Sequence, residues 1–261
     1  MSSVRIAIIQ TSLFWEDKQA NLNMLESKIQ GLDVSVQLVI LPEMFSTGFS
    51  MNAKSLAETM DGKTMQWIKA LSSKKRIIII GSLIIEEEGK FYNRLIWMMP
   101  NGNMGYYDKR HLFAFAGEDQ HYHSGQKRLI ASVNGMKINL QICYDLRFPV
   151  WARQQEPNEY DVLVYVANWP EKRSHAWKSL LTARAIENQC YVVGVNRVGK
   201  DGLGNTYSGD SSLIGPMGEI IYQKADAEDV FIYTLQKSTV TEVREKLPFL
   251  KDADVFRIEE A

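Results

Sequence analysis

Short runs of apolar, largely β-branched residues alternate with longer amphipathic segments along this chain. Residues 4–10 and 37–41 are mostly apolar, as in buried strands, and residues 17–30 between them carry apolar side chains at helical spacing. This alternation is typical of a layered α/β fold, in which helices cover the faces of a sheet. It argues against a helical bundle and against an all-β sandwich.

The same pattern continues to the end of the chain. We expect further strands at residues 76–85, 92–99, 104–108, 137–142, 162–167, 191–196, 211–214, 219–223 and 230–234, and further helices at 64–75, 149–155 and 174–188. No linker or low-complexity segment divides the chain. The sequence therefore predicts one domain over residues 1–239, with a two-layer sheet core covered by helices on both outer faces. A polar helix and tail over residues 240–261 could contact a partner subunit.

The charge balance and the hydrophobic runs limit the function. The chain has 30 Lys and Arg residues, 31 Asp and Glu residues and a net charge of -1, which argues against a nucleic-acid partner. The longest apolar stretch, residues 77–85, is far shorter than the roughly 20 residues that span a bilayer. Residues 4–12 do not have the pattern of a signal peptide, and two cysteines cannot build a disulfide framework in a chain of this size. We expect a cytoplasmic protein without membrane association.

Several binding motifs are incomplete. Residues 62–64 resemble the end of a phosphate-binding loop, but the glycine required five places earlier is absent. His121 and His123 share a short segment, but no Cys-x-x-Cys or His-x-x-x-His spacing accompanies them. We therefore expect neither a metal nor an organic cofactor.

Three reactive side chains lie where predicted strands end. Glu43 follows residues 37–41, Lys109 follows residues 104–108, and Cys143 follows residues 137–142. Singly, each has an ordinary explanation: a solvated acid, a surface cation and a core thiol. Open α/β sheets nevertheless place their chemistry beyond the carboxyl ends of strands. A nucleophilic thiol needs a base for its proton and a cation for the charge that develops, and Glu43 and Lys109 are side chains of these two kinds.

The segments around these residues resemble motifs of the carbon-nitrogen hydrolase, or nitrilase, superfamily. The matching segments occur in the family order at residues 39–45, 107–113, 142–149 and 183–189. The resemblance implies a four-layer αββα sandwich and a Glu43, Lys109 and Cys143 triad without a cofactor. It also implies that Glu118 is a second catalytic glutamate, although a solvated loop acid is the alternative. Members of the superfamily are usually homodimers or larger assemblies, so the same is expected here.

Within the superfamily the chain most resembles the ω-amidases, on the strength of residues 168–173. This resemblance implies hydrolysis of the side-chain amide of 2-oxoglutaramate or 2-oxosuccinamate through a cysteine thioester. Arg173 is a candidate for binding the substrate carboxylate, and the backbone N–H of Tyr144 for binding the oxyanion. Trp169 and Phe45 could line the pocket or belong to the core.

Other readings of the same residues stay open. Arg173 could be a solvated charge, and Arg147 could pair with Asp145. A nitrilase or an N-carbamoyl amide hydrolase would use the same triad and differ only in the shape of its pocket. A non-catalytic protein of the same fold is a further alternative, although the three reactive residues in their motifs argue against it.

Overall fold

Strand β1 (Ser3–Gln10) is buried on both of its faces. Ile6 and Ile8 pack into a hydrophobic core shared by two sheets, whereas Ala7 and Ile9 pack into a second core under helices. Successive side chains of a strand point to opposite faces, so a strand between two apolar layers has to be apolar throughout. This burial explains why the consecutive residues 6–9 of the first strand are all apolar.

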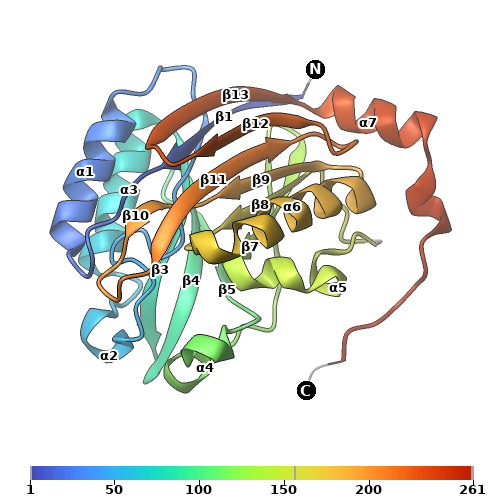
Figure 1. The fold of residues 1–261 in the computed structure, drawn as a ribbon. Coiled ribbons are helices and arrows are strands. Elements are labelled where there is room, and N and C mark those ends of the chain that lie inside the picture. The colour runs from blue at the N-terminus through green and yellow to red at the C-terminus, as the bar shows by residue number, and fades with distance from the viewer. Residues whose placement is uncertain (1, 156, 260–261) are drawn as a thin grey trace.

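The computed structural model describes residues 2–155 and 157–259, and it contains two mixed sheets. The first sheet has the strand order β13-β1-β2-β3-β4-β5 (Figure 1). Its strands after β1 are β2 (Leu38–Ile40), β3 (Ile78–Glu87), β4 (Lys90–Met98), β5 (Met104–Asp108) and β13 (Asp229–Gln236). β1, β2 and β3 are parallel, and the other neighbouring pairs are antiparallel.

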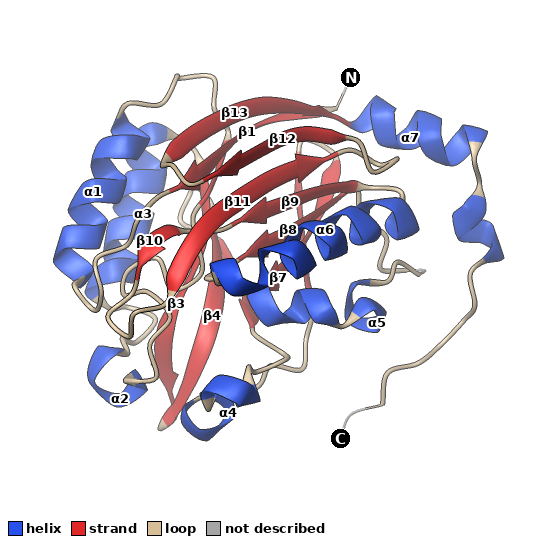
Figure 2. Cartoon of the chain, viewed as in Figure 1, coloured by secondary structure: helices blue, strands red, loops and turns tan. Residues whose placement is uncertain are grey.

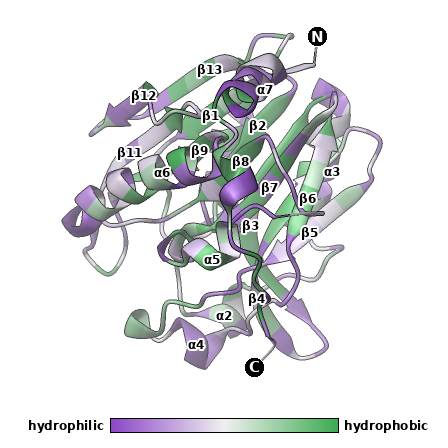
Figure 3. Cartoon of the chain, turned by 90° about the vertical axis from the view of Figure 1, so that its right-hand side faces the viewer, coloured by the Kyte–Doolittle hydropathy of each residue, from purple (hydrophilic) through white to green (hydrophobic). Residues whose placement is uncertain are grey.

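The second sheet has the order β10-β11-β9-β8-β7-β6, with β12 paired to β11. Its strands are β6 (Leu129–Val133), β7 (Met136–Ile142), β8 (Val162–Val166), β9 (Tyr191–Val195), β10 (Val198–Lys200), β11 (Thr206–Ile214) and β12 (Ile220–Ala225). The parallel strands β7, β8 and β9 form its centre. Their inner faces pack against the first sheet, and Figure 3 shows that hydrophobic residues concentrate on the strands of both sheets.

Helices cover both outer faces of the sheet pair (Figure 2). α1 (Lys18–Gln30) and α3 (Lys63–Lys75) lie on the first sheet, and α6 (Ser174–Asn188) lies on the second. The remaining helical segments are α2 (Ala53–Leu56), α4 (Glu118–His121), α5 (Pro149–Ala152), α7 (Lys237–Lys246) and the 3-10 turns η1 (Ala114–Ala116), η2 (Cys143–Arg147), η3 (Glu171–Arg173) and η4 (Phe249–Asp252). The expected αββα layering is confirmed.

Most of the expected elements are present with small shifts at their ends. The helix expected at residues 149–155 is shorter, because α5 ends at Ala152. β6, β10, α2 and α4 were not expected from the sequence, and each has five residues or fewer. Among the described residues, no helix has the length and hydrophobicity needed to cross a bilayer.

Candidate active site

The ends of three strands from the two sheets bring Glu43, Lys109 and Cys143 together. Lys109 follows β5 and Cys143 follows β7, while Glu43 comes shortly after β2. Nζ of Lys109 donates a hydrogen bond to Oε1 of Glu43 at 2.9 Å. Lys109 is 1% exposed and Glu43 is 0% exposed, so water screens this ion pair little. Cys143 is also buried, and both Glu43 and Lys109 act on its thiol, so the three sequence-predicted residues form one buried cluster.

Glu118 completes the coordination of the same ammonium group. Its two carboxylate oxygens accept hydrogen bonds from Lys109 at 3.0 and 2.9 Å, and the backbone N–H of Phe113 donates a further bond at 2.6 Å. Asn93, on the buried part of β4, donates to Glu43 at 2.8 Å and to Glu118 at 3.3 Å. Glu118 is fully buried, so it is not the solvated loop acid of the alternative reading.

Asn168, just after β8, fixes the orientation of Glu43. Its backbone N–H donates to Oε2 of Glu43 at 2.8 Å, and its side-chain amide donates to the Glu43 carbonyl at 2.5 Å. One oxygen of the Glu43 carboxylate is thus held by Asn168 and the other by Lys109 and Asn93. A carboxylate held from both sides has one orientation, which suits a base that must face one particular proton.

Cys143 begins the short η2 turn with a left-handed backbone conformation. Its φ angle is +43°, a value that is uncommon for a non-glycine residue and tends to occur at functional sites. The preceding strand β7 ends at Ile142, so this left-handed residue stands where the chain leaves the sheet. The thiol borders the cavity described below.

The charges in the cluster affect the three titratable groups differently. Burial raises the pKa of the Cys143 thiol well above its usual value, and the negative charge of Glu43 raises this pKa further. Burial also raises the pKa of Glu118, against the opposing charge of Lys109. Burial alone would lower the pKa of Lys109, but Glu118 and Glu43 outweigh it and raise this pKa. Burial therefore disfavours the thiolate form of Cys143, whereas the two carboxylates favour the charged form of Lys109.

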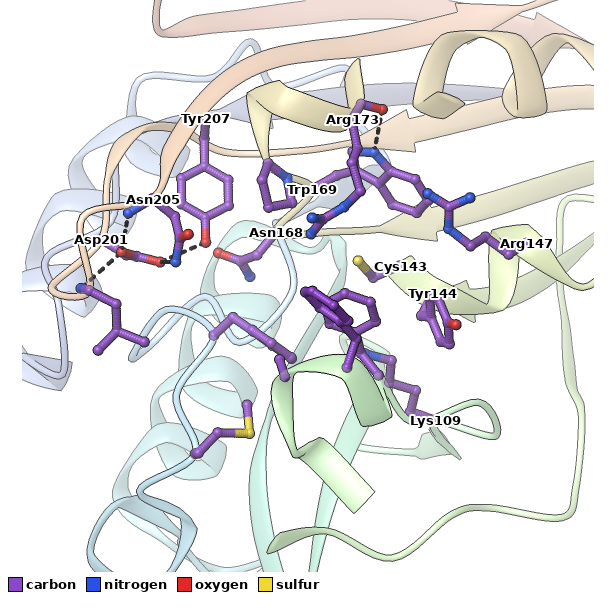
Figure 4. A pocket seen from close by; sticks show the side chains of 17 residues that line it. Lys109, Cys143, Tyr144, Arg147, Asn168, Trp169, Arg173, Asp201, Asn205 and Tyr207 are labelled. Carbon is purple, nitrogen blue, oxygen red and sulfur yellow. Dashed lines mark hydrogen bonds between the residues drawn. The ribbon is translucent and has the colours of Figure 1, made fainter. Parts of the chain in front are cut away.

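A cavity of about 200 Å³ opens above Cys143 (Figure 4). Lys109 and Cys143 form part of its floor, and Tyr144, Trp169 and Arg173 are among its walls. Its other lining residues are Phe49, Met51, Phe113, Phe115, Ala116, Arg147, Asn168, Pro170, Asp201, Leu203, Asn205 and Tyr207. The volume suits a small molecule of a few carbon atoms.

Two guanidinium groups border one side of the cavity. Arg147 lies over the ring of Trp169 at 4.9 Å and Arg173 over the ring of Phe113 at 5.1 Å. Within residues 2–155 and 157–259, neither forms a salt bridge. Arg147 does not pair with Asp145. A carboxylate that enters the cavity would therefore find two cations free to bind it.

The opposite side of the cavity is built on Asp201. Its carboxylate accepts hydrogen bonds from the side chains of Asn205 and Tyr207 at 2.8 Å each, and from the backbone N–H groups of Leu203 and Asn205. These bonds order the turn between β10 and β11. In Figure 4, Asp201 and Tyr207 lie on the other side of Cys143 from Arg147.

Phe45 is the one sequence-predicted pocket residue that lies elsewhere. Its ring is fully buried in the core between the first sheet and its helices, 6.1 Å from the ring of Trp67. Gly81 on β3 makes room for it, since a Cβ atom there would lie 2.7 Å from the Phe45 ring. Phe45 thus belongs to the core, because the turn after Glu43 directs it away from the cavity.

Sequence reasoning missed Asn93 and Asn168. A signal for Asn93 was present, because an amide in the middle of a buried strand requires hydrogen-bond partners. Asn168 lies two residues after the end of β8, close to a strand exit as Cys143 is after β7. Among the described residues, no group of three or more His, Cys, Asp or Glu side chains is arranged to hold a metal ion.

Comparison with known proteins agrees with this geometry. The carbon-nitrogen hydrolase family profile matches residues 5–245. The chain is 43% identical to omega-amidase YafV of Escherichia coli K12 over 99% of this chain and 100% of that protein. It is 31% identical to 2-oxoglutaramate amidase of Bacillus subtilis, over 95% of this chain and 96% of that protein.

A solved structure is also similar over the whole chain. XC1258 of Xanthomonas campestris, described as a CN-hydrolase superfamily protein with an arsenic adduct in its active site, has a TM-score of 0.97. The two chains are 41% identical, with 99% of this chain and 100% of that chain covered. The family match, the relatives and the fold agree with one another. This chain is a member of the carbon-nitrogen hydrolase family.

Proposed function

We propose that this carbon-nitrogen hydrolase cleaves the side-chain amide of a short α-keto acid. The substrates are 2-oxoglutaramate and 2-oxosuccinamate, and the products are the corresponding dicarboxylate and ammonia. The observation that carries the proposal is the buried cluster of Cys143, Glu43 and Lys109 beneath a small cavity with two free guanidinium groups. The names of the Escherichia coli and Bacillus subtilis relatives support the same substrate class.

In the first half of the reaction, Cys143 attacks the carbonyl carbon of the amide. Glu43 takes the thiol proton as the carbon–sulfur bond forms, because the raised pKa of Cys143 leaves little thiolate beforehand. The ammonium group of Lys109 and the backbone N–H of Tyr144 stabilise the tetrahedral oxyanion. Glu43 then passes the proton to the nitrogen, and the carbon–nitrogen bond breaks to release ammonia and leave a thioester on Cys143.

In the second half, water hydrolyses the thioester. Glu43 removes a proton from the water as its oxygen bonds to the carbonyl carbon, and the same oxyanion donors act again. The intermediate collapses to a carboxylic acid, and the proton held by Glu43 returns to the sulfur. Glu118 keeps Lys109 in place through both halves by hydrogen bonds of 3.0 and 2.9 Å.

The far carboxylate of the substrate binds beside Arg173 and Arg147. Both guanidinium groups border the cavity and are free of salt bridges within the described residues, and both lie over aromatic rings. Tyr144 and Trp169 flank the carbon chain of the substrate. The guanidinium groups thereby favour an ω-amide that carries a negative charge over a neutral amide of the same length.

The test is ammonia release from 2-oxoglutaramate by the wild type and by Cys143→Ala, with intact-mass detection of the acyl-enzyme. We expect turnover in the wild type alone and an acyl adduct on Cys143. A neutral amide, a nitrile and an N-carbamoyl compound of similar size serve as comparison substrates. Faster turnover of one of these by the wild type would refute the substrate assignment, and an active Cys143→Ala variant would refute the nucleophile.

The cellular location and the oligomeric state of the enzyme are part of the same proposal. The enzyme works in the cytoplasm as a homodimer or larger homo-oligomer, with the segment from residue 240 at the subunit contact. The location is supported by the two cysteines, which are both free thiols, as reducing compartments favour. Sedimentation of the full chain and of a chain ending at residue 239 tests the assembly. Equal masses per particle would refute the proposed contact.

A further inference from the structure

Asp145 is a fully buried carboxylate that the mechanism above does not use. Each of its oxygens accepts two hydrogen bonds. Oδ1 accepts from the backbone N–H of His111 at 3.0 Å and from Nδ1 of the same residue at 2.8 Å. Oδ2 accepts from the hydroxyl of Tyr107 at 2.7 Å and from the backbone N–H of Ile142 at 3.0 Å. Because a carboxylate only accepts, Nδ1 of His111 carries the proton.

These four donors belong to the two segments that carry the reactive groups. Tyr107 and His111 flank Lys109 on either side in the sequence, and Ile142 directly precedes Cys143. The two segments come from different sheets, since β5 is an edge strand of the first sheet and β7 lies in the second. The hydrogen bonds of Asp145 therefore connect the segment around Lys109 to the turn at Cys143.

We propose that Asp145 is a positioning residue that sets the separation between Cys143 and the oxyanion-stabilising ammonium group of Lys109. The proposal rests on the roles given to Cys143 and Lys109 above. Both residues must reach the same carbonyl group of the substrate, one at its carbon and the other at its oxygen. The Asp145 carboxylate supplies that alignment without touching the substrate.

The backbone of Cys143 adds a second reason for such a restraint. A left-handed conformation at a non-glycine residue persists only where its surroundings enforce it. The bond from the Ile142 N–H to Asp145 closes the turn around Cys143. Without it, the turn could relax toward an ordinary backbone conformation, and the sulfur would move relative to Lys109.

Further contacts hold the side chains that donate to Asp145. The Tyr107 hydroxyl, which donates to Asp145, accepts hydrogen bonds from Nε1 of Trp151 and from the backbone N–H of Arg110. The His111 ring stacks on Phe148 with 3.9 Å between ring centroids. The donors to Asp145 are thus held in place, so a change at the carboxylate alters the bonds rather than being absorbed by moving side chains.

The first variant is Asp145→Asn, which keeps the shape and replaces one oxygen by an N–H donor. Whichever oxygen is replaced, a backbone N–H of His111 or Ile142 loses its acceptor and faces another donor. We expect kcat for 2-oxoglutaramate to fall about 10²-fold, as for a displacement near 1 Å, with KM changed less than about threefold.

A binding measurement separates alignment from folding. The aldehyde analogue of the substrate forms a hemithioacetal, in which the Cys143 sulfur bonds to the carbonyl carbon and the thiol proton moves to the adduct. Its affinity depends on Cys143 and Lys109 together, whereas the product 2-oxoglutarate binds without a bond to sulfur. We expect Asp145→Asn to weaken the aldehyde by more than tenfold and the product by less than threefold.

His111 gives a matched pair of variants on a less buried residue. Asn at position 111 can place an amide N–H near the position of Nδ1 and keep the bond to Asp145, whereas Leu cannot. We expect His111→Asn to retain most of kcat and of the aldehyde affinity, and His111→Leu to lose both. Asp161→Asn is the control, because Asp161 also accepts a backbone N–H bond in the interior, from Lys137 at the opposite end of β7.

Three outcomes would overturn the positioning role. These are unchanged aldehyde affinity in Asp145→Asn, equal loss of aldehyde and product affinity, and equal activities in the two His111 variants. If Asp145→Asn does not fold, the two His111 variants decide. A wild type that neither hydrolyses 2-oxoglutaramate nor binds 2-oxoglutarate refutes the proposed function instead. The alignment is then measured with the amide that the wild type does hydrolyse and its aldehyde.

Discussion

The Nζ atom of Lys109 lies 2.9 Å from Oε1 of Glu43, and both side chains are shielded from solvent. Glu118 adds a second carboxylate to the same ammonium group. The buried cluster thus has two acids for one cation, and Lys109 is the positive charge that both carboxylates contact.

Replacing Lys109 by Arg keeps the charge but changes its shape and its donors. We expect kcat to fall by about 10²–10³-fold, the usual effect of losing an oxyanion donor, because a planar guanidinium cannot take the place of a compact ammonium group. Steady-state kinetics on 2-oxoglutaramate measures the change. Activity within threefold of wild type would contradict a specific role for the ammonium group.

Glu43→Gln should separate proton removal from thiol acidity. Burial is the main cause of the raised pKa of Cys143 and the charge of Glu43 adds to it, so the variant should have a lower Cys143 pKa. Turnover should nevertheless be lost, because no base remains. Iodoacetamide alkylation of Cys143 followed against pH measures the thiol, and Cys190 is the internal comparison. A midpoint equal to or above that of the wild type would contradict the prediction.

Glu118 should make stability depend on pH in a defined direction. Burial raises its pKa in the folded state, with Lys109 opposing, so folding favours the protonated form. The stability from this group is complete below the unfolded pKa of about 4.3 and is lost as pH rises through the folded value. Urea unfolding from pH 4 to pH 8 should show stability falling less with pH in Glu118→Gln than in the wild type. A steeper fall of stability with pH in the variant than in the wild type would contradict the raised pKa of Glu118.

Arg173→Met tests carboxylate recognition. We expect KM for 2-oxoglutaramate to rise by about 10–100-fold, which corresponds to one charge-assisted hydrogen bond, with a smaller change in kcat. Hydrolysis of a neutral amide of equal length should be affected little. Lys172→Met is the control, since the neighbouring Lys172 does not line the cavity. Equal effects on the charged and neutral amides would show that Arg173 acts on the shape of the pocket.

Phe45→Leu should affect stability and leave binding unchanged. The ring packs against Trp67 and Gly81 in the core, so we expect a loss of about 1 kcal/mol in the free energy of unfolding. KM should stay within twofold of wild type. Phe113→Leu is the matched variant, because Phe113 lines the cavity and should change KM with little loss of stability. The reverse pattern would place Phe45 in substrate binding.

Much of the fold could be predicted because hydrophobic periodicity reports burial directly. Residues 4–9 are apolar except for Arg5, since Ile6 and Ala7 face different cores and both faces of the strand are covered. β10 was not predicted, because three residues, of which Gly199 and Lys200 are exposed, carry no periodic signal. Its pairing with β11 depends on contacts between separate segments, which local pattern does not encode.

The site was predictable in its chemistry and less so in its geometry. Glu43, Lys109 and Cys143 stand at strand ends, and their motifs identified them together. The side of the strand exit to which Phe45 points depends on a positive φ at Met44, which no composition rule reveals. Asp145 likewise bonds to His111, whose segment meets Asp145 only in the folded chain, and local sequence pattern does not reveal that partner.

The pairing of β1 with β13 also has a consequence for synthesis on the ribosome. Gln10 pairs with Asp229, and the Gln10 side chain donates to the carbonyl groups of Lys224 and Ala227. β1 leaves the exit tunnel before the other strands of its sheet, and it therefore keeps an open edge until β13 has been translated. Such an edge can recruit a strand from another nascent chain. Slowing translation ahead of residue 229 would prolong this exposure, and a chaperone that covers β1 would shorten it.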